Sequence, residues 1–458
     1  MEKIINTPCG QIKGTAGIQA GVTAYKGIRY ATAGRWEYPQ IVKSWEGIYD
    51  ATQYGNCSFQ PRSFYNEAEM PEKAFYYNEF RKGESYTYSE DCLFLNVWTP
   101  ETADENSKLP VLFYIHGGGF NGGCGHEKHF DGPVWPTKDV VAVTINYRMG
   151  PLGFACLESL AEEAGHTGNY GIFDQIAALQ WVRENIGAFG GNPDNITIMG
   201  QSAGAMSVQV LCLSPLTDGM FAKAVMSSAG GTAEYFPINT TAQDSYRLWN
   251  TVMEECGCAS LEEFRKVEPQ KLWDSWKSAQ KKLEMKGFTS PICIDGKLLT
   301  KTSPEILVEG SFKNIPYLVG STSHDMMSPL LFKMMKDWAV LQAQQGKQDS
   351  WCWMMDRMLP GDDNGSWHSS DLWYWFGTLA NCWRPFEKLD WQLSDTMTDY
   401  LCNFAKTGNP NGENLPVWTA TKQQSDPVLH WGDDGVRMAQ PDIEKLDYIF
   451  RTVKPVGE

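Results

Sequence analysis

The most regular feature of the chain is a series of short runs rich in β-branched and aliphatic residues. These runs lie at Val111–His116, Val140–Tyr147, Ile196–Met199, Ala222–Ser227 and Pro316–Gly320. Several are almost continuously apolar, which is typical of strands that are buried on both faces of a sheet. A further run at Val428–Trp431 predicts a last strand.

Segments with helical spacing separate the predicted strands. In Asp174–Asn185, for example, apolar residues such as Ile176 and Leu179 recur every three to four positions, which is the pattern of a helix with an apolar face. Alternating strands and helices predict an α/β protein with a mostly parallel central sheet flanked by helices.

Two longer segments do not follow this alternation. Residues 232–313 are charged and helical in character, and residues 326–367 are rich in Met, Trp and Gln without a strong strand. Both are predicted to be helical cap or lid insertions. Because we find no internal repeat and no flexible linker, residues 1–458 are expected to form a single domain.

The composition fits a folded protein with a large core, because 42% of the 458 residues are hydrophobic and 21% are charged. The formal net charge is −16 and no run of Lys or Arg stands out, which argues against nucleic-acid binding. No apolar run is long enough for a signal sequence or a bilayer span, and the twelve cysteines follow no disulfide or zinc spacing. We therefore expect no membrane association and a cytoplasmic location.

The first chemical signal is Gly200-Gln201-Ser202-Ala203-Gly204, a GxSxG motif. It follows an apolar strand and precedes Met206–Leu213, which can form a helix. A serine in this context is the nucleophile of an α/β-hydrolase elbow. The glycines allow the backbone to pass close to its neighbours in the tight turn from strand to helix.

The second signal is a glycine run, His116-Gly117-Gly118-Gly119-Phe120, directly after a predicted strand. The amides of such a run can converge on the oxyanion of a tetrahedral intermediate, together with the amide of Ala203 at the start of the helix.

A serine nucleophile needs a histidine base, which in turn needs an orienting carboxylate. In this fold the order along the chain is Ser, acid, His, so the base must follow Ser202. Three histidines remain, and His430 lies inside a predicted strand, where a structural role is more usual. The residues alone favour His368, in a polar loop, without excluding His324.

Asp325 is the first candidate for the acid, because it follows the predicted strand Pro316–Gly320 and so lies at the same edge of the sheet as Ser202. Asp371 is the alternative. It follows His368 by three residues, and we expect it instead to cap the next helix.

The segment His126-Glu127-Lys128-His129 places two imidazoles and a carboxylate within four residues. It is not an HExxH motif and we find no third ligand in the sequence. We therefore predict a solvated turn here and no metal site.

The chain resembles the type-B carboxylesterases, the family that also includes the cholinesterases and bacterial p-nitrobenzyl esterases. The resemblance runs nearly end to end and rests on Tyr25–Ala31, Glu90–Val97, His116–Phe120, Gly168–Gln175, Phe189–Pro193, Gly200–Gly204, His368–Leu372 and Thr407–Gly412. It implies the α/β-hydrolase fold, hydrolysis of small-molecule esters through an acyl-enzyme, and no cofactor.

The resemblance also assigns roles to residues. It implies a nucleophile, acid and base at Ser202, Asp325 and His368, and an oxyanion hole formed by Gly118, Gly119 and Ala203. Many members carry Glu where this chain has Asp325, so the shorter side chain requires a closer approach to the histidine. Gln201 replaces the Glu of cholinesterases, which argues against a cationic choline ester.

Three further expectations follow from the resemblance. Cys57 and Cys92 match a pair that is disulfide-bonded in secreted members, and their redox state here is left open. Only 43 residues separate Asp325 from His368, fewer than in larger members, which predicts an open gorge that accepts bulky esters. Trp367, Trp373 and Trp375 are candidates for the substrate pocket, with a core position as the alternative.

Two other functions are compatible with this sequence. The first is a catalytically inactive binding or scaffold protein, since some family members have lost the serine. The second is the same machinery acting on a thioester, lactone or amide.

Overall fold

A computed structural model describes residues 2–66, 70–232, 236–285 and 290–441. Within these ranges thirteen strands form one sheet, in the order β1-β2-β3-β9-β11-β10-β12-β13-β14-β15-β16-β17 with β6 beside β2. The strands are β1 (Lys3–Thr7), β2 (Gly10–Ala16), β3 (Val22–Arg29), β6 (Ile48–Asp50), β9 (Phe94–Pro100), β10 (Leu109–Ile115), β11 (Val141–Ile145), β12 (Gly191–Gln201), β13 (Lys223–Ser227), β14 (Tyr317–Thr322), β15 (Ser350–Met355), β16 (Val428–Gly432) and β17 (Gly435–Ala439).

The centre of the sheet is parallel. Seven consecutive strands pair in parallel with one another, in the order β11, β10, β12, β13, β14, β15 and β16. On one side β9 pairs antiparallel with β11, and β3, β2 and β1 continue that antiparallel arrangement; on the other side β17 pairs antiparallel with β16. Two short pairs lie outside the sheet, β4 (Ala31–Thr32) with β5 (Gln40–Ile41) and β7 (Cys57–Ser58) with β8 (Tyr88–Ser89). The predicted mostly parallel sheet is confirmed.

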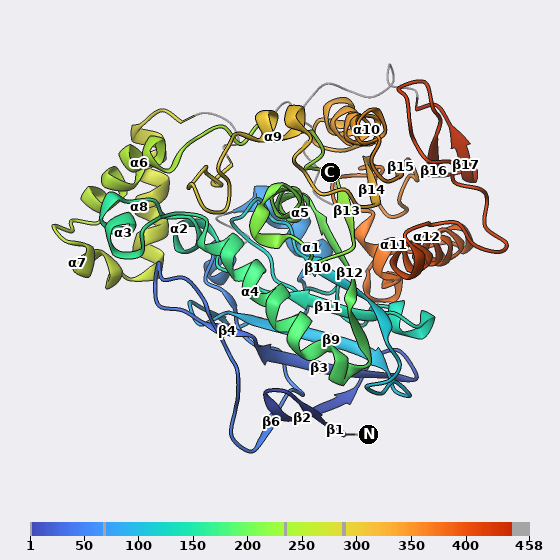
Figure 1. Cartoon of the computed structure of the whole chain (residues 1–458), viewed down its shortest axis with the longest axis horizontal. Coiled ribbons are helices and arrows are strands. Elements are labelled where there is room, and N and C mark those ends of the chain that lie inside the picture. The colour runs from blue at the N-terminus through green and yellow to red at the C-terminus, as the bar shows by residue number, and fades with distance from the viewer. Residues whose placement is uncertain (1, 67–69, 233–235, 286–289, 442–458) are drawn as a thin grey trace.

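Helices cover both faces of this sheet (Figure 1). They are α1 (Ala74–Phe80), α2 (Gly150–Gly153), α3 (Glu158–Ala164), α4 (Tyr170–Asn185), α5 (Ala203–Leu213), α6 (Ala242–Glu255), α7 (Leu261–Arg265), α8 (Pro269–Lys282), α9 (Ser303–Glu309), α10 (Ser328–Gln344), α11 (Leu372–Phe376) and α12 (Lys388–Thr407).

Strand alternation divides the interior into two layers. In β10, Val111 and Phe113 pack in one apolar cluster with α4, α5 and α10, whereas Leu112 and Tyr114 pack in another with α11 and α12. Successive side chains of a strand point to opposite faces, so a strand that is apolar at every position must be covered on both sides. This explains the continuous apolar runs in the sequence.

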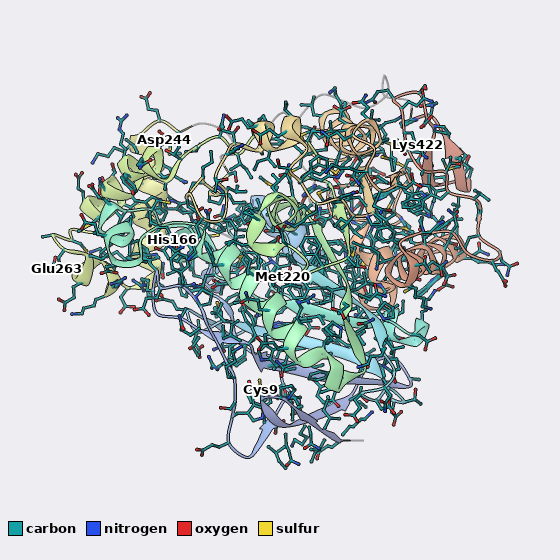
Figure 2. The ribbon with its side chains drawn as sticks, viewed as in Figure 1. Cys9, His166, Met220, Asp244, Glu263 and Lys422 are labelled. Atoms are coloured by element: carbon teal, nitrogen blue, oxygen red, sulfur yellow. The ribbon has the colours of Figure 1, made fainter. Side chains whose placement is uncertain are left out.

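A third apolar cluster lies away from the sheet, where α6, α7 and α8 pack against α2 and α3. These helices form a separate lobe in Figure 1, and Figure 2 shows Asp244 and Glu263 on its outer edge. The lobe belongs to the segment 232–313, whose helical character is confirmed.

The predicted strands are confirmed, although their ends shift by a few residues. The expectation that residues 326–367 lack a strand is wrong, because Ser350–Met355 forms β15, a fully buried strand between β14 and β16. The run Ser-Trp-Cys-Trp-Met-Met contains no β-branched residue, although its two tryptophans favour a strand, and pairing with β14 and β16 buries it completely. Among the described residues, no helix combines the length and the apolar composition needed to cross a membrane.

Candidate active site

The turn between β12 and α5 holds Ser202 in a rare backbone conformation, with φ 57° and ψ −127°. A residue in such a conformation is strained and is retained where the surrounding structure enforces it. The Ser202 amide donates to the Ser227 carbonyl of the neighbouring strand at 2.9 Å. Ser202 is therefore fixed by the sheet, at the point where the parallel strands end.

The two glycines of the GxSxG motif are required by close backbone contacts. A Cβ at Gly200 would lie 2.2 Å from the Gly204 carbonyl oxygen, and a Cβ at Gly204 would lie 2.0 Å from the Ile115 carbonyl oxygen. Neither position tolerates a side chain. The tight turn predicted from the motif is confirmed, because both glycines lie where the backbone comes too close for a side chain.

The glycine run after β10 lies directly against this turn. A Cβ at Gly117 would lie 3.0 Å from the Cβ of Ser202. Gly118 has φ 104°, and a Cβ there would lie 1.8 Å from the Gly122 carbonyl oxygen, whereas one at Gly119 would meet nothing within 4 Å. The glycine run and the serine turn, predicted separately, are thus neighbours.

The backbone amides where the glycine run lies against the serine turn are free to bind a ligand. In the described part of the chain, no hydrogen bond is donated by the amides of Gly118, Gly119 or Ala203. Ala203 is the first residue of α5, where backbone amides lack partners within the helix. Free amides of this kind can stabilise a developing negative charge.

His368 and Asp325 form a buried pair. The Nδ1 atom of His368 lies 2.5 Å from Oδ1 of Asp325. His368 is 7% exposed and Asp325 is 0% exposed. The amide of His324 donates to the Ser366 carbonyl at 3.1 Å, and His324 forms an isolated bridge with Trp367. This bridge brings the two loops together and offsets the shorter reach of aspartate.

The pair shifts the pKa of both members. Burial alone lowers the pKa of His368, but the charge of Asp325 and its hydrogen bond outweigh burial and raise it above 6.5. Burial alone raises the pKa of Asp325, and here the charge and hydrogen bond of His368 prevail and lower it. Asp325 therefore stays ionised and accepts the Nδ1 proton, which leaves Nε2 as the basic nitrogen.

Gln201 faces that basic nitrogen. Its Nε2 atom lies 3.3 Å from Nε2 of His368, so the side-chain amide donates to the imidazole. Ser202 and His368 line the same cavity. This contact could not be predicted from the sequence, because a residue next to the nucleophile could point to either side of the turn.

Asp371 does not cap the helix that follows it, contrary to prediction. It occupies the N-cap position of α11, but its side chain makes no capping bond there. Instead its Oδ2 accepts a hydrogen bond from the Ser227 hydroxyl at 2.7 Å in the interior. Burial raises the pKa of Asp371 to about 6, and the nearby charge of Asp325 contributes to this rise.

The inner cavity, the space lined by Ser202 and His368, measures about 640 Å³. Its apolar wall comes largely from Phe80, Phe130, Phe236, Met326, Met327, Leu331 and Leu372. Among the described residues that line it, the three candidate tryptophans are absent. Trp367, Trp373 and Trp375 are 0 to 1% exposed and belong to the core beside α12, which is the position stated above as the alternative to a pocket role.

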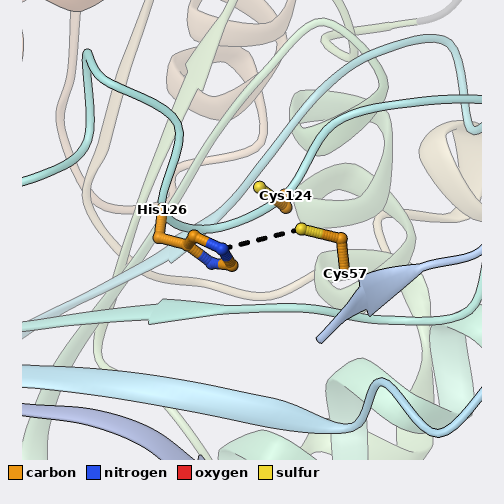
Figure 3. A group of neighbouring side chains, drawn as sticks. All are labelled: Cys57, Cys124 and His126. Carbon is orange, nitrogen blue, oxygen red and sulfur yellow. Dashed lines mark hydrogen bonds between the residues drawn. The ribbon is translucent and has the colours of Figure 1, made fainter. Parts of the chain in front are cut away.

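The prediction of a solvated turn at residues 126–129 is also wrong. His126, Glu127 and His129 are all buried. The Nε2 atom of His126 lies 3.6 Å from Sγ of Cys57, and Cys124 completes a group whose possible ligand atoms lie within 4.8 Å of one another (Figure 3). Two thiols and an imidazole are ligands that zinc prefers, and only the folded chain brings them together.

Cys57 and Cys92, the pair left open by the sequence, are both free thiols, as are the other ten cysteines. His430 is buried in β16 with Nδ1 3.3 Å from Oδ2 of Asp356. The predicted structural position of His430 is thus confirmed.

Known proteins resemble this chain over nearly its full length. A family model described as the carboxylesterase family matches residues 1–355 and 338–448. The chain is 31% identical to the para-nitrobenzyl esterase of Bacillus subtilis (strain 168), with 98% of each protein covered. It is 35% identical to carboxylesterase 1D of Rattus norvegicus, over 69% of this chain and 57% of the relative.

Solved structures agree. A structure described as a thermophilic PNB esterase matches with a TM-score of 0.82 at 28% identity, covering 98% of this chain and 100% of the other.

Proposed function

Because the chain belongs to the carboxylesterase family and is a serine carboxylic-ester hydrolase with the α/β-hydrolase fold, we propose that Ser202 is its nucleophile, His368 its base and Asp325 the orienting acid. The contact that carries the proposal is the 2.5 Å bond between His368 and Asp325, at a cavity that Ser202 also lines. It leaves Nε2 of His368 as the basic nitrogen.

Acylation begins when the Ser202 hydroxyl attacks the ester carbonyl carbon and Nε2 of His368 takes its proton. The carbonyl oxygen becomes an oxyanion, held by the amides of Gly118, Gly119 and Ala203. The ester C–O bond then breaks, and His368 returns the proton to the departing alcohol.

Deacylation repeats these steps with water. Water gives a proton to His368 and attacks the acyl-enzyme, the bond to Ser202 breaks, and the carboxylic acid leaves as the serine regains its proton. Asp325 keeps its charge throughout and stabilises the imidazolium.

The two loop glycines provide a test of the oxyanion hole. We expect Gly118→Ala to lower kcat at least 100-fold, since losing one oxyanion donor costs about 3 kcal/mol and a Cβ there would collide with the Gly122 carbonyl oxygen. In Gly119→Ala the new Cβ would lie in open space, so the main expected effect is a loss of about 1 kcal/mol in folding stability, because position 119 has a positive φ. Steady-state rates with thermal melting of both variants measure the difference, and equal losses would contradict it.

The raised pKa of His368 predicts the acid side of the pH profile. Only the neutral imidazole accepts the Ser202 proton, so kcat/KM should fall as the pH drops through the pKa of His368, with a midpoint above 6.5. Asp325→Asn removes the charge that raises this pKa and should move the midpoint down. A midpoint below 6.5 in the parent enzyme would contradict the assignment of His368.

Residues from both segments line the substrate site, but only the segment 232–313 keeps the description as a cap element, because the segment 326–367 contains β15 of the central sheet. Phe236 comes from the segment 232–313, whereas Met326 and Leu331 come from the segment 326–367. An apolar cavity of this size suits esters with a bulky apolar group, in line with the predicted open gorge. The related para-nitrobenzyl esterase suggests 4-nitrobenzyl esters as first substrates.

Twelve free thiols support a reducing compartment such as the cytoplasm.

A further inference from the structure

A second cavity, the outer cavity, adjoins the inner one. It measures about 590 Å³ and is bounded by α1 and α8 and by the glycine run. Arg62, Tyr76, Gly118 and Gly119 line both cavities. A ligand can therefore extend from the inner cavity, past the proposed oxyanion hole, into the outer one.

The outer cavity has an unusual charge for this protein. Its lining includes Arg62, Lys73, Arg81 and Lys277, and no residue of its described lining is acidic. The whole chain carries a formal net charge of −16. A cleft whose charge opposes that of the rest of the protein attracts ligands of the opposite sign.

Arg81 is the residue of this cavity with the clearest capacity to bind an anion. It is 8% exposed, yet among the described residues no carboxylate pairs with it. Its Nη2 donates to the Arg62 carbonyl at 3.2 Å and to the Tyr88 hydroxyl at 2.9 Å, whereas its buried Nε has no partner. A buried guanidinium without a counter-charge is costly, and an anionic ligand would remove that cost.

Arg62 lies between Arg81 and the reacting centre. Its guanidinium pairs with Glu127, the one acid among the described residues that line the inner cavity. It also lies against Gly122, two residues beyond the glycine run, since a Cβ at Gly122 would lie 2.7 Å from its Nε. Burial raises the pKa of Glu127 to about 7, so the carboxylate that pairs with Arg62 is only partly ionised near neutral pH.

We propose that the outer cavity is a subsite for a substrate carboxylate, so that the preferred substrates are half-esters of dicarboxylic acids with a bulky apolar alcohol. The apolar group occupies the inner cavity, the ester carbonyl lies at the glycine run, and the free carboxylate reaches Arg81 and Arg62. Planar guanidinium groups match a carboxylate with paired hydrogen bonds. This inference rests on the proposed function and names its substrate class.

Two matched substrates test the subsite. Mono(4-nitrobenzyl) glutarate and 4-nitrobenzyl methyl glutarate differ in whether the distal carboxylate is free or methylated. Initial rates of 4-nitrobenzyl alcohol release are measured, so that cleavage of the methyl ester does not contribute. We expect the parent enzyme to show a kcat/KM at least about tenfold higher on the monoanion, because hydrogen bonds to charged groups are about twice as strong as neutral ones. The advantage should lie mainly in KM and should shrink as salt is added.

Three variants show which residues cause the preference for the monoanion. Arg81→Gln should lower the ratio of kcat/KM between monoanion and methyl ester about tenfold, and Lys277→Gln, at the exposed rim, should lower it less. The ratio does not depend on the fraction of folded enzyme, so partial misfolding of Arg81→Gln cannot imitate the result. Arg437→Gln, on the exposed strand β17, should leave the ratio at the parent value.

The outcomes separate the two proposals. Equal kcat/KM on both esters in the parent enzyme, or an unchanged ratio in Arg81→Gln, overturns the carboxylate subsite and leaves the esterase mechanism intact. If the parent hydrolyses 4-nitrophenyl butyrate but neither glutarate ester, the carboxylate subsite alone is overturned. If it hydrolyses none of the three esters, both proposals are overturned.

Discussion

Ser202→Ala is expected to lower kcat for a simple ester such as 4-nitrophenyl butyrate by about a million-fold, the loss seen when a serine hydrolase loses its nucleophile. Without the hydroxyl no acyl-enzyme forms, and His368 has no proton to accept. The fold should survive, because the backbone amide of Ser202, not its hydroxyl, makes the bond to Ser227. The measurement is kcat with a melting curve for each protein.

Covalent labelling makes this test independent of substrate choice. A fluorophosphonate probe should label the parent enzyme once and Ser202→Ala not at all. Ser245→Ala, in helix α6 away from the cavity, should keep parental labelling and rate. Labelling of the Ser202→Ala protein would move the nucleophile elsewhere, and a parent protein that neither reacts nor turns over any ester would favour the scaffold function.

The strands and the serine turn could be predicted because local sequence determines them. A strand covered on both faces must be apolar throughout, as Val111–Ile115 is. The close contacts at Gly200 and Gly204 leave glycine as the only option. The order along the chain and the shared edge of a parallel sheet indicated Asp325 and favoured His368 without excluding His324, and the family resemblance then assigned His368.

What could not be predicted depends on contacts between distant parts of the chain. β15 has no β-branched residue to mark it in the sequence, and its place in the sheet is evident only from its pairing with β14 and β16. The segment His126–His129 is polar, yet loop packing buries it against Cys57 and Cys124. Arg81 in the sequence is one of many basic residues, and only its burial without a carboxylate singles it out.

A second large loss of kcat is expected on replacing Asp325, and it tests whether Asp325 or Asp371 orients His368. Asp325→Asn is expected to lower kcat by about 10⁴-fold, the loss seen when a triad aspartate is neutralised elsewhere. Asparagine cannot hold the Nδ1 proton as a charged acceptor, so the imidazole loses both its orientation and the stabilisation of its positive form. Rates near neutral pH, together with the pH profile, measure the effect.

Asp371→Asn is the matched control, because it removes an equally buried carboxylate three residues from His368. Asp371 accepts a hydrogen bond from Ser227, and its pKa of about 6 means that it is partly protonated in mildly acidic solution. An asparagine resembles that protonated form, so kcat should fall less than tenfold at low pH. A larger loss in Asp371→Asn than in Asp325→Asn would transfer the orienting role to Asp371, since His368 depends on whichever carboxylate keeps its charge during proton transfer.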